Sequence, residues 1–197
     1  PFFFSQEKEK GSQQLYAKVM TYFVWVLAGT FLFVMLYLDL FKHFIPNEAY
    51  WEGLKIVPIL LIANIFLGIY YNQSVWYKLT DRTSFGAGLA IFGAAITVIL
   101  NLLFIPTYGY VASAWVTLAC YGSMMVVSYF LGQKYYPVPY EVGKLLGFLI
   151  AAVGLYWLSQ IMNLPEGFLG WMLNLAFLTV YLGLSWFLLR PKSKPNT

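Results

Sequence analysis

The sequence is poor in charged residues, and this scarcity excludes an ordinary soluble fold. Only 10% of its 197 residues are charged and 60% are hydrophobic, whereas soluble domains carry about 25% charged residues. Cysteine and histidine occur once each, so the sequence offers neither a disulfide framework nor the clustered ligands of a metal site. It also lacks a zincin motif, a phosphate loop, a dinucleotide fingerprint and a nucleophile elbow. We therefore expect no catalytic residue, no cofactor and no metal, and a protein that is not an enzyme.

The net charge is small, at +4, and the basic residues are dispersed over separate polar segments. Domains that bind nucleic acid instead gather their bases in a patch or stripe, often with stacking aromatics. We therefore expect no nucleic-acid partner.

Long apolar runs, by contrast, recur along the whole chain. A helix of about 20 residues crosses the roughly 30 Å hydrocarbon core of a bilayer, and these runs are too continuously apolar for the alternating strands of a membrane barrel. We predict an all-α integral membrane protein with six transmembrane helices. The predicted spans are residues 19–38, 54–76, 85–105, 111–131, 144–162 and 168–189. A tight turn at residues 106–109 is predicted to join the third and fourth helices as a hairpin.

The basic residues predict how these helices are oriented. Of the twelve Lys and Arg residues, ten fall on one side of the predicted membrane, and two, Lys42 and Lys55, fall on the other. Because cytoplasmic loops are enriched in Lys and Arg, we expect both termini to be cytoplasmic. The ten are Lys8, Lys10, Lys18, Lys78, Arg82, Lys134, Lys144, Arg190, Lys192 and Lys194.

The first residues suggest that the chain is the carboxyl part of a longer protein. The apolar PFFF is followed by a polar, charged run, which reverses the order found in a signal peptide. We expect residues 1–18 to be the end of a preceding helix plus a cytoplasmic loop. Residues 19–132 are then a four-helix part, and residues 133–197 are an additional helix pair with a cytoplasmic tail.

The stretch YYNQSVWYKLTDRTSFG, residues 70–86, gathers amides, aromatics and charges between two apolar runs. We expect a cytoplasmic helix end and turn, with its aromatics in the interfacial belt. Lys78 and Arg82 are expected to anchor this turn at the anionic inner leaflet.

Amide side chains occur within the predicted spans. Asn64 lies near the middle of the second span, and Asn72 and Gln73 lie toward its cytoplasmic end. A polar side chain in hydrocarbon needs a partner, so we expect these faces to look inward. For Asn64 and Asn101 we expect a hydrogen bond between helices.

A motif-level pattern runs through the middle of the chain. The second helix is followed by Thr80, Asp81 and Arg82, the third closes on Asn-Leu-x-x-Ile-Pro at residues 101–106, and a turn led by Gly109 opens a helix rich in small residues. In these features the chain, most strongly over residues 69–131, resembles the carboxyl half of the polysaccharide-unit flippases of the multidrug, oligosaccharidyl-lipid and polysaccharide exporter superfamily. One departure is the absence of the second glycine that the family often has before its alanines.

The resemblance implies a two-lobed transporter of the bacterial inner membrane, with two six-helix bundles around a central cavity. It implies that alternating access moves an oligosaccharide on a polyprenyl diphosphate from the inner to the outer leaflet, for surface polysaccharide biosynthesis. The implied partners are the lipid bilayer, a missing amino-terminal lobe and the lipid-linked oligosaccharide. Candidate contacts to this cargo are Lys78, Arg82, Asn64, Asn72 and Gln73, with the two bases facing its diphosphate.

Other readings stay open at this point. A drug or cation exporter of the same superfamily shares the helix plan but more often carries an acidic residue inside a helix. An integral-membrane glycosyltransferase or ligase of the same pathway needs acids or bases in an outer loop, where Asp39, His43, Glu48 and Glu52 are available. A purely structural membrane anchor is the third alternative.

Overall fold

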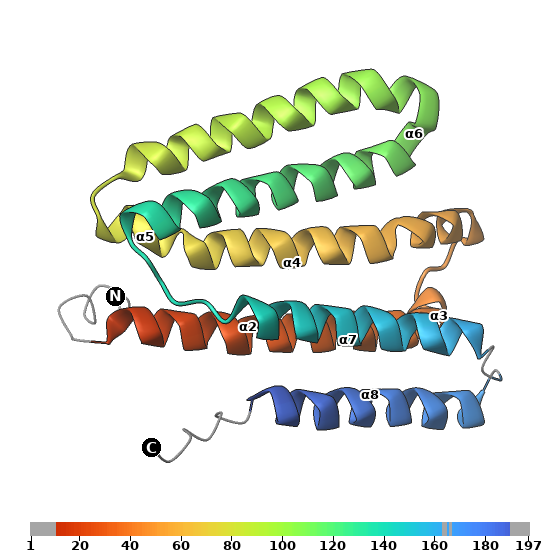
Figure 1. Ribbon diagram of the computed structural model, residues 1–197. Coiled ribbons are helices and arrows are strands. Elements are labelled where there is room, and N and C mark those ends of the chain that lie inside the picture. Colours follow the sequence, from red (N-terminus) through yellow and green to blue (C-terminus); the bar gives the residue numbers. More distant parts are fainter. Residues whose placement is uncertain (1–10, 163–164, 166, 190–197) are drawn as a thin grey trace, which may run out of the picture. The chain divides into compact units, whose positions relative to one another are not determined.

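The computed structural model describes residues 11–162, 165 and 167–189, and within these ranges the chain is helical apart from short turns, with no strand (Figure 1). This confirms the prediction of an all-α protein. The helices are α2 (Ser12–Leu36), α3 (Leu38–Lys42), the 3-10 helix η1 (Glu48–Ile56), α4 (Val57–Gln73), α5 (Val75–Leu79), α6 (Thr83–Tyr135), α7 (Val142–Ile161) and α8 (Phe168–Leu189).

Long apolar helices dominate the described chain. Five helical stretches are long and apolar enough to cross a membrane, and one of them is α6, with 53 residues. The backbone of α6 leaves helical geometry at Gly109, with φ 62° and ψ −148°, a region open essentially to glycine alone. Figure 1 shows α6 doubling back on itself. The predicted hairpin is therefore present, although Pro106 lies within the helix and the reversal is confined to Gly109.

The chain divides into two compact units. Unit 1 consists of Pro1–Met20 and Asn47–Tyr140, and unit 2 of Thr21–Pro46 and Glu141–Thr197. These units are defined by contact, whereas the predicted segments 1–18, 19–132 and 133–197 follow the order of the chain, so the latter remain a prediction.

The core of unit 1 forms where α4 and α5 pack against α6. Small residues allow close approach at several points, as expected for helices that meet in lipid. Gly93 lies against the side chain of Met124, and Gly122 lies against Phe66. The Cys120 thiol donates to the Gly93 carbonyl at 3.3 Å, which ties the two arms of α6 together. The buried cluster comprises Tyr70, Trp76, Tyr77, Leu89, Cys120 and Met124.

In unit 2, α8 is tied to the later part of α2 by hydrogen bonds from side chains to backbone carbonyls. The Tyr181 hydroxyl donates to Trp25 at 2.8 Å, and the Asn174 amide donates to Leu36 at 2.7 Å. Polar groups that find partners between helices are characteristic of helix packing in membranes.

The start of α2 differs from the prediction. Residues 12–18 were predicted as part of a loop but are helical, since α2 begins directly after Gly11, which has φ 116°. Hydropathy sets where a helix enters lipid but not where it begins, so a polar first turn extends the helix beyond its apolar run. The rest of the predicted loop and the PFFF segment, residues 1–10, lie outside the described residues.

Candidate functional site

The polar stretch after α4 folds as a short helix and a tight turn. The Ser74 hydroxyl donates to the Tyr71 carbonyl at 2.6 Å as α4 ends, and α5 follows. Asp81 then adopts a left-handed conformation, with φ 54°, and the Arg82 N–H donates to the Tyr77 carbonyl at 2.8 Å. Such a bond closes a helix C-terminus across a left-handed residue. The predicted helix end and turn are therefore confirmed, and α6 starts at the next residue.

Aromatic side chains pack around Trp76 at this turn. The Tyr135 ring stacks on the Trp76 ring with centroids 5.8 Å apart and an interplanar angle of 18°, and Phe85 meets Trp76 edge-on at 5.5 Å. The indole Nε1–H donates to the buried Ser128 hydroxyl at 3.2 Å. A Cβ atom placed on Gly132 would come within 2.9 Å of the indole Cδ1, so only glycine lets α6 pass this close.

The aromatics predicted for the interfacial belt are Tyr70, Tyr71, Trp76 and Tyr77, and the prediction is wrong for three of these four rings. Tyr70, Trp76 and Tyr77 are buried in the core of unit 1, and Tyr71 alone of the four is exposed, at 63%. The short helix α5 packs against α6, so the rings fill the space between helices instead of facing the headgroups.

Two cations lie beside the Tyr135 ring. The guanidinium carbon of Arg82 is 4.2 Å from the ring centroid, and Lys134 Nζ is 5.5 Å from it. Both fall within the roughly 6 Å over which a cation is attracted to an aromatic face. Both side chains, and that of Lys78, are exposed, so their charges remain accessible from outside the unit.

The first turns of α2 reach the same end of unit 1. The Ser12 and Tyr136 hydroxyls are 3.2 Å apart, and the ring of Tyr16 lies 6.4 Å from that of Tyr136. Burial raises the pKa of the neighbouring Tyr140 phenol, and Tyr129 and Tyr136 raise it further, so Tyr140 adds no negative charge here at neutral pH. We call this end of unit 1 the basic end; its exposed bases are Lys18, Lys78, Arg82 and Lys134.

The opposite end of unit 1 carries acids. Glu52 lies 3.6 Å from Lys55 in an exposed ion pair, and the Tyr110 hydroxyl donates to the Glu52 carbonyl at 3.4 Å. Glu48 lies in η1 with them. Within the described part of unit 1, the basic end carries four exposed bases and one exposed acid, Asp81, so the net positive charge is concentrated there.

The predicted site residues on α4 have different environments. Gln73 is buried, and its Oε1 has no hydrogen-bond partner among the described residues. Asn72 is half-buried, and Asn64 is exposed. The Asn64 amide donates to the Leu60 carbonyl of its own helix at 2.7 Å, so the predicted interhelical bond of Asn64 is wrong.

The distance along α4 explains how these residues group. Asn64 precedes Gln73 by nine positions, about 13 Å along a helix, so it lies well away from the turn that carries Lys78 and Arg82.

Asn101, on α6, also lacks its predicted interhelical bond at Oδ1, which is buried and has no hydrogen-bond partner within the described chain. An amide can satisfy its own helix, and sequence spacing does not distinguish this from a bond between helices.

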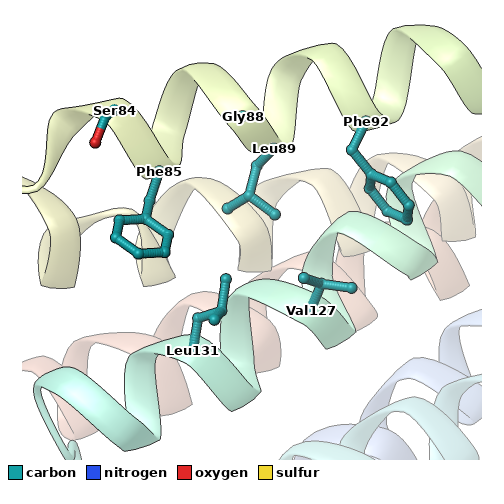
Figure 2. Close-up of a pocket in the computed structure, with 7 residues that line it drawn as sticks. All are labelled: Ser84, Phe85, Gly88, Leu89, Phe92, Val127 and Leu131. Carbon is teal, nitrogen blue, oxygen red and sulfur yellow. The ribbon is translucent and has the colours of Figure 1, made fainter.

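A groove that sequence reasoning missed lies between the two arms of α6. Its volume is about 410 Å³, within the range of roughly 300–1,000 Å³ typical of ligand pockets. Figure 2 shows its side chains converging from the facing arms. The lining residues are Ser84, Phe85, Gly88, Leu89, Phe92, Val127 and Leu131. A Cβ at Gly88 would meet nothing within 4 Å, and the sequence alone carried no signal for this groove.

The acids and histidine considered for an enzyme do not assemble a metal site. Among the described residues, no group of three or more His, Cys, Asp or Glu side chains is placed to hold a metal ion. His43 Nδ1 lies 2.7 Å from the backbone carbonyl of Asp39, and the Glu52 carboxylate pairs with Lys55. The candidate site of unit 1 is therefore its basic end together with the apolar groove between the arms of α6. Comparison of the chain with protein-family models, curated proteins and solved structures finds no match.

Proposed function

We propose that this chain is part of a flippase that moves polyprenyl-diphosphate-linked oligosaccharide units from the inner to the outer leaflet of the bacterial cell membrane. Its six spanning helices are α2, α4 with its flanking short helices, the two arms of α6, α7 and α8. Both termini are cytoplasmic in this proposal, and the basic end of unit 1 faces the cytoplasm.

The observation that carries the proposal is the local structure of the segment that resembles the exporters. The Thr80 to Arg82 turn, the run at residues 101–106 and the break at Gly109 form one turn followed by one helical hairpin. The concentration of exposed bases at the turn supports a cytoplasmic orientation, because cytoplasmic segments are enriched in Lys and Arg.

The cargo chemistry assigns a role to the basic end. A diphosphate carries negative charge that Lys binds as a point charge and Arg binds through its planar fork. Lys78 is exposed in α5, and Asn72 is half-buried near the end of α4, where its amide can donate to sugar hydroxyls. Gln73 is buried and is left out of this contact. Transport then proceeds by alternating access between this bundle and a preceding lobe, and no covalent bond changes.

The test is surface polysaccharide in a bacterial strain that lacks its own flippase and expresses the transporter containing this chain. We expect Lys78→Gln and Arg82→Gln to lower polysaccharide export at unchanged protein abundance, and Arg82→Lys to restore only part of it. Lys55→Gln, an exposed base at the opposite end, is the matched control. Normal export by both Gln variants at the basic end would contradict a cargo role for these bases, and absence of rescue by the unaltered protein would contradict the flippase proposal.

A further inference from the structure

The groove of α6 and two cations of the basic end form one continuous surface. Phe85 lines the groove, and its ring centroid lies 5.3 Å from that of Tyr135. Leu131, on the opposite wall, precedes Tyr135 by one helical turn. The Tyr135 ring therefore lies next to the Phe85 end of the groove, and Arg82 and Lys134 lie beside the ring of Tyr135.

The two cations at this mouth are available to an anion. In the described chain the carboxylate pairs are Glu52 with Lys55 and Glu141 with Lys144, so neither Arg82 nor Lys134 is neutralised by a carboxylate there. A cation on an aromatic face keeps its outward N–H donors, and a guanidinium is suited to phosphate oxygens. The Ser84 hydroxyl, at the same end of the groove, supplies a further donor.

The groove itself is apolar and belongs to a helix of membrane-spanning composition. Leu89, Phe92, Val127 and Leu131 face it from both arms (Figure 2), and α6 is long and apolar enough to cross a membrane. An apolar groove in lipid next to two cations that form no ion pair with a described carboxylate matches an amphiphile with a hydrocarbon chain and an anionic head.

We infer that this groove binds one acyl chain of an anionic phospholipid, with the phosphate of that lipid held by Arg82 and Lys134. The charge at the mouth selects an anionic lipid over a zwitterionic one, because the quaternary amine of a choline headgroup is repelled by the two cations that bind its phosphate. The site does not depend on the proposed transport function.

The experiment measures lipid binding to the purified 197-residue chain in detergent by native mass spectrometry. The probes are dioleoyl phosphatidylglycerol and dioleoyl phosphatidylcholine, which share their acyl chains. We expect the glycerol lipid to bind at least about fivefold more tightly, and each of Arg82→Gln and Lys134→Gln to weaken it about fivefold, as for one base near an anionic headgroup. Lys55→Gln is expected to leave the affinity unchanged.

A second measurement locates the acyl chain. Phosphatidylglycerol with a diazirine on its acyl chain is expected to cross-link within residues 84–92 and 127–131. Gly88→Leu fills open space in the groove and is expected to abolish these cross-links, whereas Gly154→Leu, also at an open helical glycine, is expected to retain them. The charge variants involve exposed side chains and keep the proposal testable if Gly88→Leu misfolds.

Three results would overturn the inference. The first is equal affinity for the two lipids. The second is unchanged phosphatidylglycerol binding when both cations are replaced. The third is retention of the groove cross-links by folded Gly88→Leu.

Discussion

The guanidinium carbon of Arg82 lies 4.2 Å from the centroid of the Tyr135 ring, so the turn before α6 is fastened to the last turn of the same helix. The contact joins two ends of one hairpin that are 53 positions apart in the sequence. It also fixes a cation at the surface of unit 1, in the turn between α5 and α6. This attachment is open to direct measurement.

A double-mutant cycle with Arg82→Gln and Tyr135→Leu measures the attachment. We expect a coupling free energy of about 0.5–1 kcal/mol, as for exposed cation–π pairs, from reversible unfolding in mixed micelles. The cycle of Lys55→Gln with Tyr135→Leu is the control, because Lys55 lies at the opposite end of the unit. Additive effects of Arg82→Gln and Tyr135→Leu, within about 0.3 kcal/mol, would show that the ring does not hold the cation.

Asp81 is held at φ 54°, where a side chain costs conformational energy and glycine does not. We expect Asp81→Gly to raise the free energy of unfolding by up to about 1 kcal/mol and Asp81→Val to lower it by about 1 kcal/mol or more. Asp81→Asn serves as the control, because Asn tolerates this conformation as well as Asp does. Equal stability of the Gly and Val variants would be incompatible with the described turn.

Gly132 and Gly88 lie on the same helix but in opposite environments. A methyl group at Gly132 would come within 2.9 Å of the Trp76 indole, whereas one at Gly88 meets nothing within 4 Å. We therefore expect Gly132→Ala to destabilise the protein by about 1–3 kcal/mol through overpacking. Gly88→Ala is expected to be neutral or to stabilise it by up to about 1 kcal/mol through helix propensity. Thermal unfolding of both variants compares the two, and a reversed order would contradict the Trp76 packing.

The break in α6 depends on a backbone region that only glycine enters readily. We expect Gly109→Ala to lower the free energy of unfolding by about 1–3 kcal/mol. Gly109→Asn is expected to give no rescue, because ψ −148° lies outside the left-handed helical region that Asn tolerates. Chemical unfolding with Gly154→Ala as control measures the difference. Wild-type stability of Gly109→Asn would mean that the reversal uses another geometry.

The proposed orientation is tested by labelling single cysteines in intact cells, in a Cys120→Ala background. Thr83 and Asn47 are both exposed and lie at opposite ends of unit 1. We expect a membrane-impermeant maleimide to label Asn47→Cys from outside and Thr83→Cys only after the cells are opened. Labelling of Thr83→Cys in intact cells would reverse the orientation.

Features that depend on local backbone chemistry were predictable from the sequence. Gly109 after an apolar run indicated the break in α6, and the polar stretch after α4 indicated a turn. The burial of Trp76 and the groove at Gly88 were not predictable, because in a membrane both the lipid-facing side and the packed side of a helix are apolar. Hydropathy therefore does not tell an interfacial ring from a core ring. The Asn64 bond was mispredicted for a related reason, since a single amide finds an acceptor one turn away in its own helix.

A reversal confined to Gly109 also has a consequence for biogenesis. The two arms, residues 83–108 and 110–135, meet with almost no intervening chain, so the entropy lost in closing the hairpin is small and its contacts are local in sequence. Such a pair is suited to enter the bilayer as one piece during synthesis, with neither arm waiting for the other. It also leaves no loop between the arms for a protease to cut or for an inserted epitope to occupy.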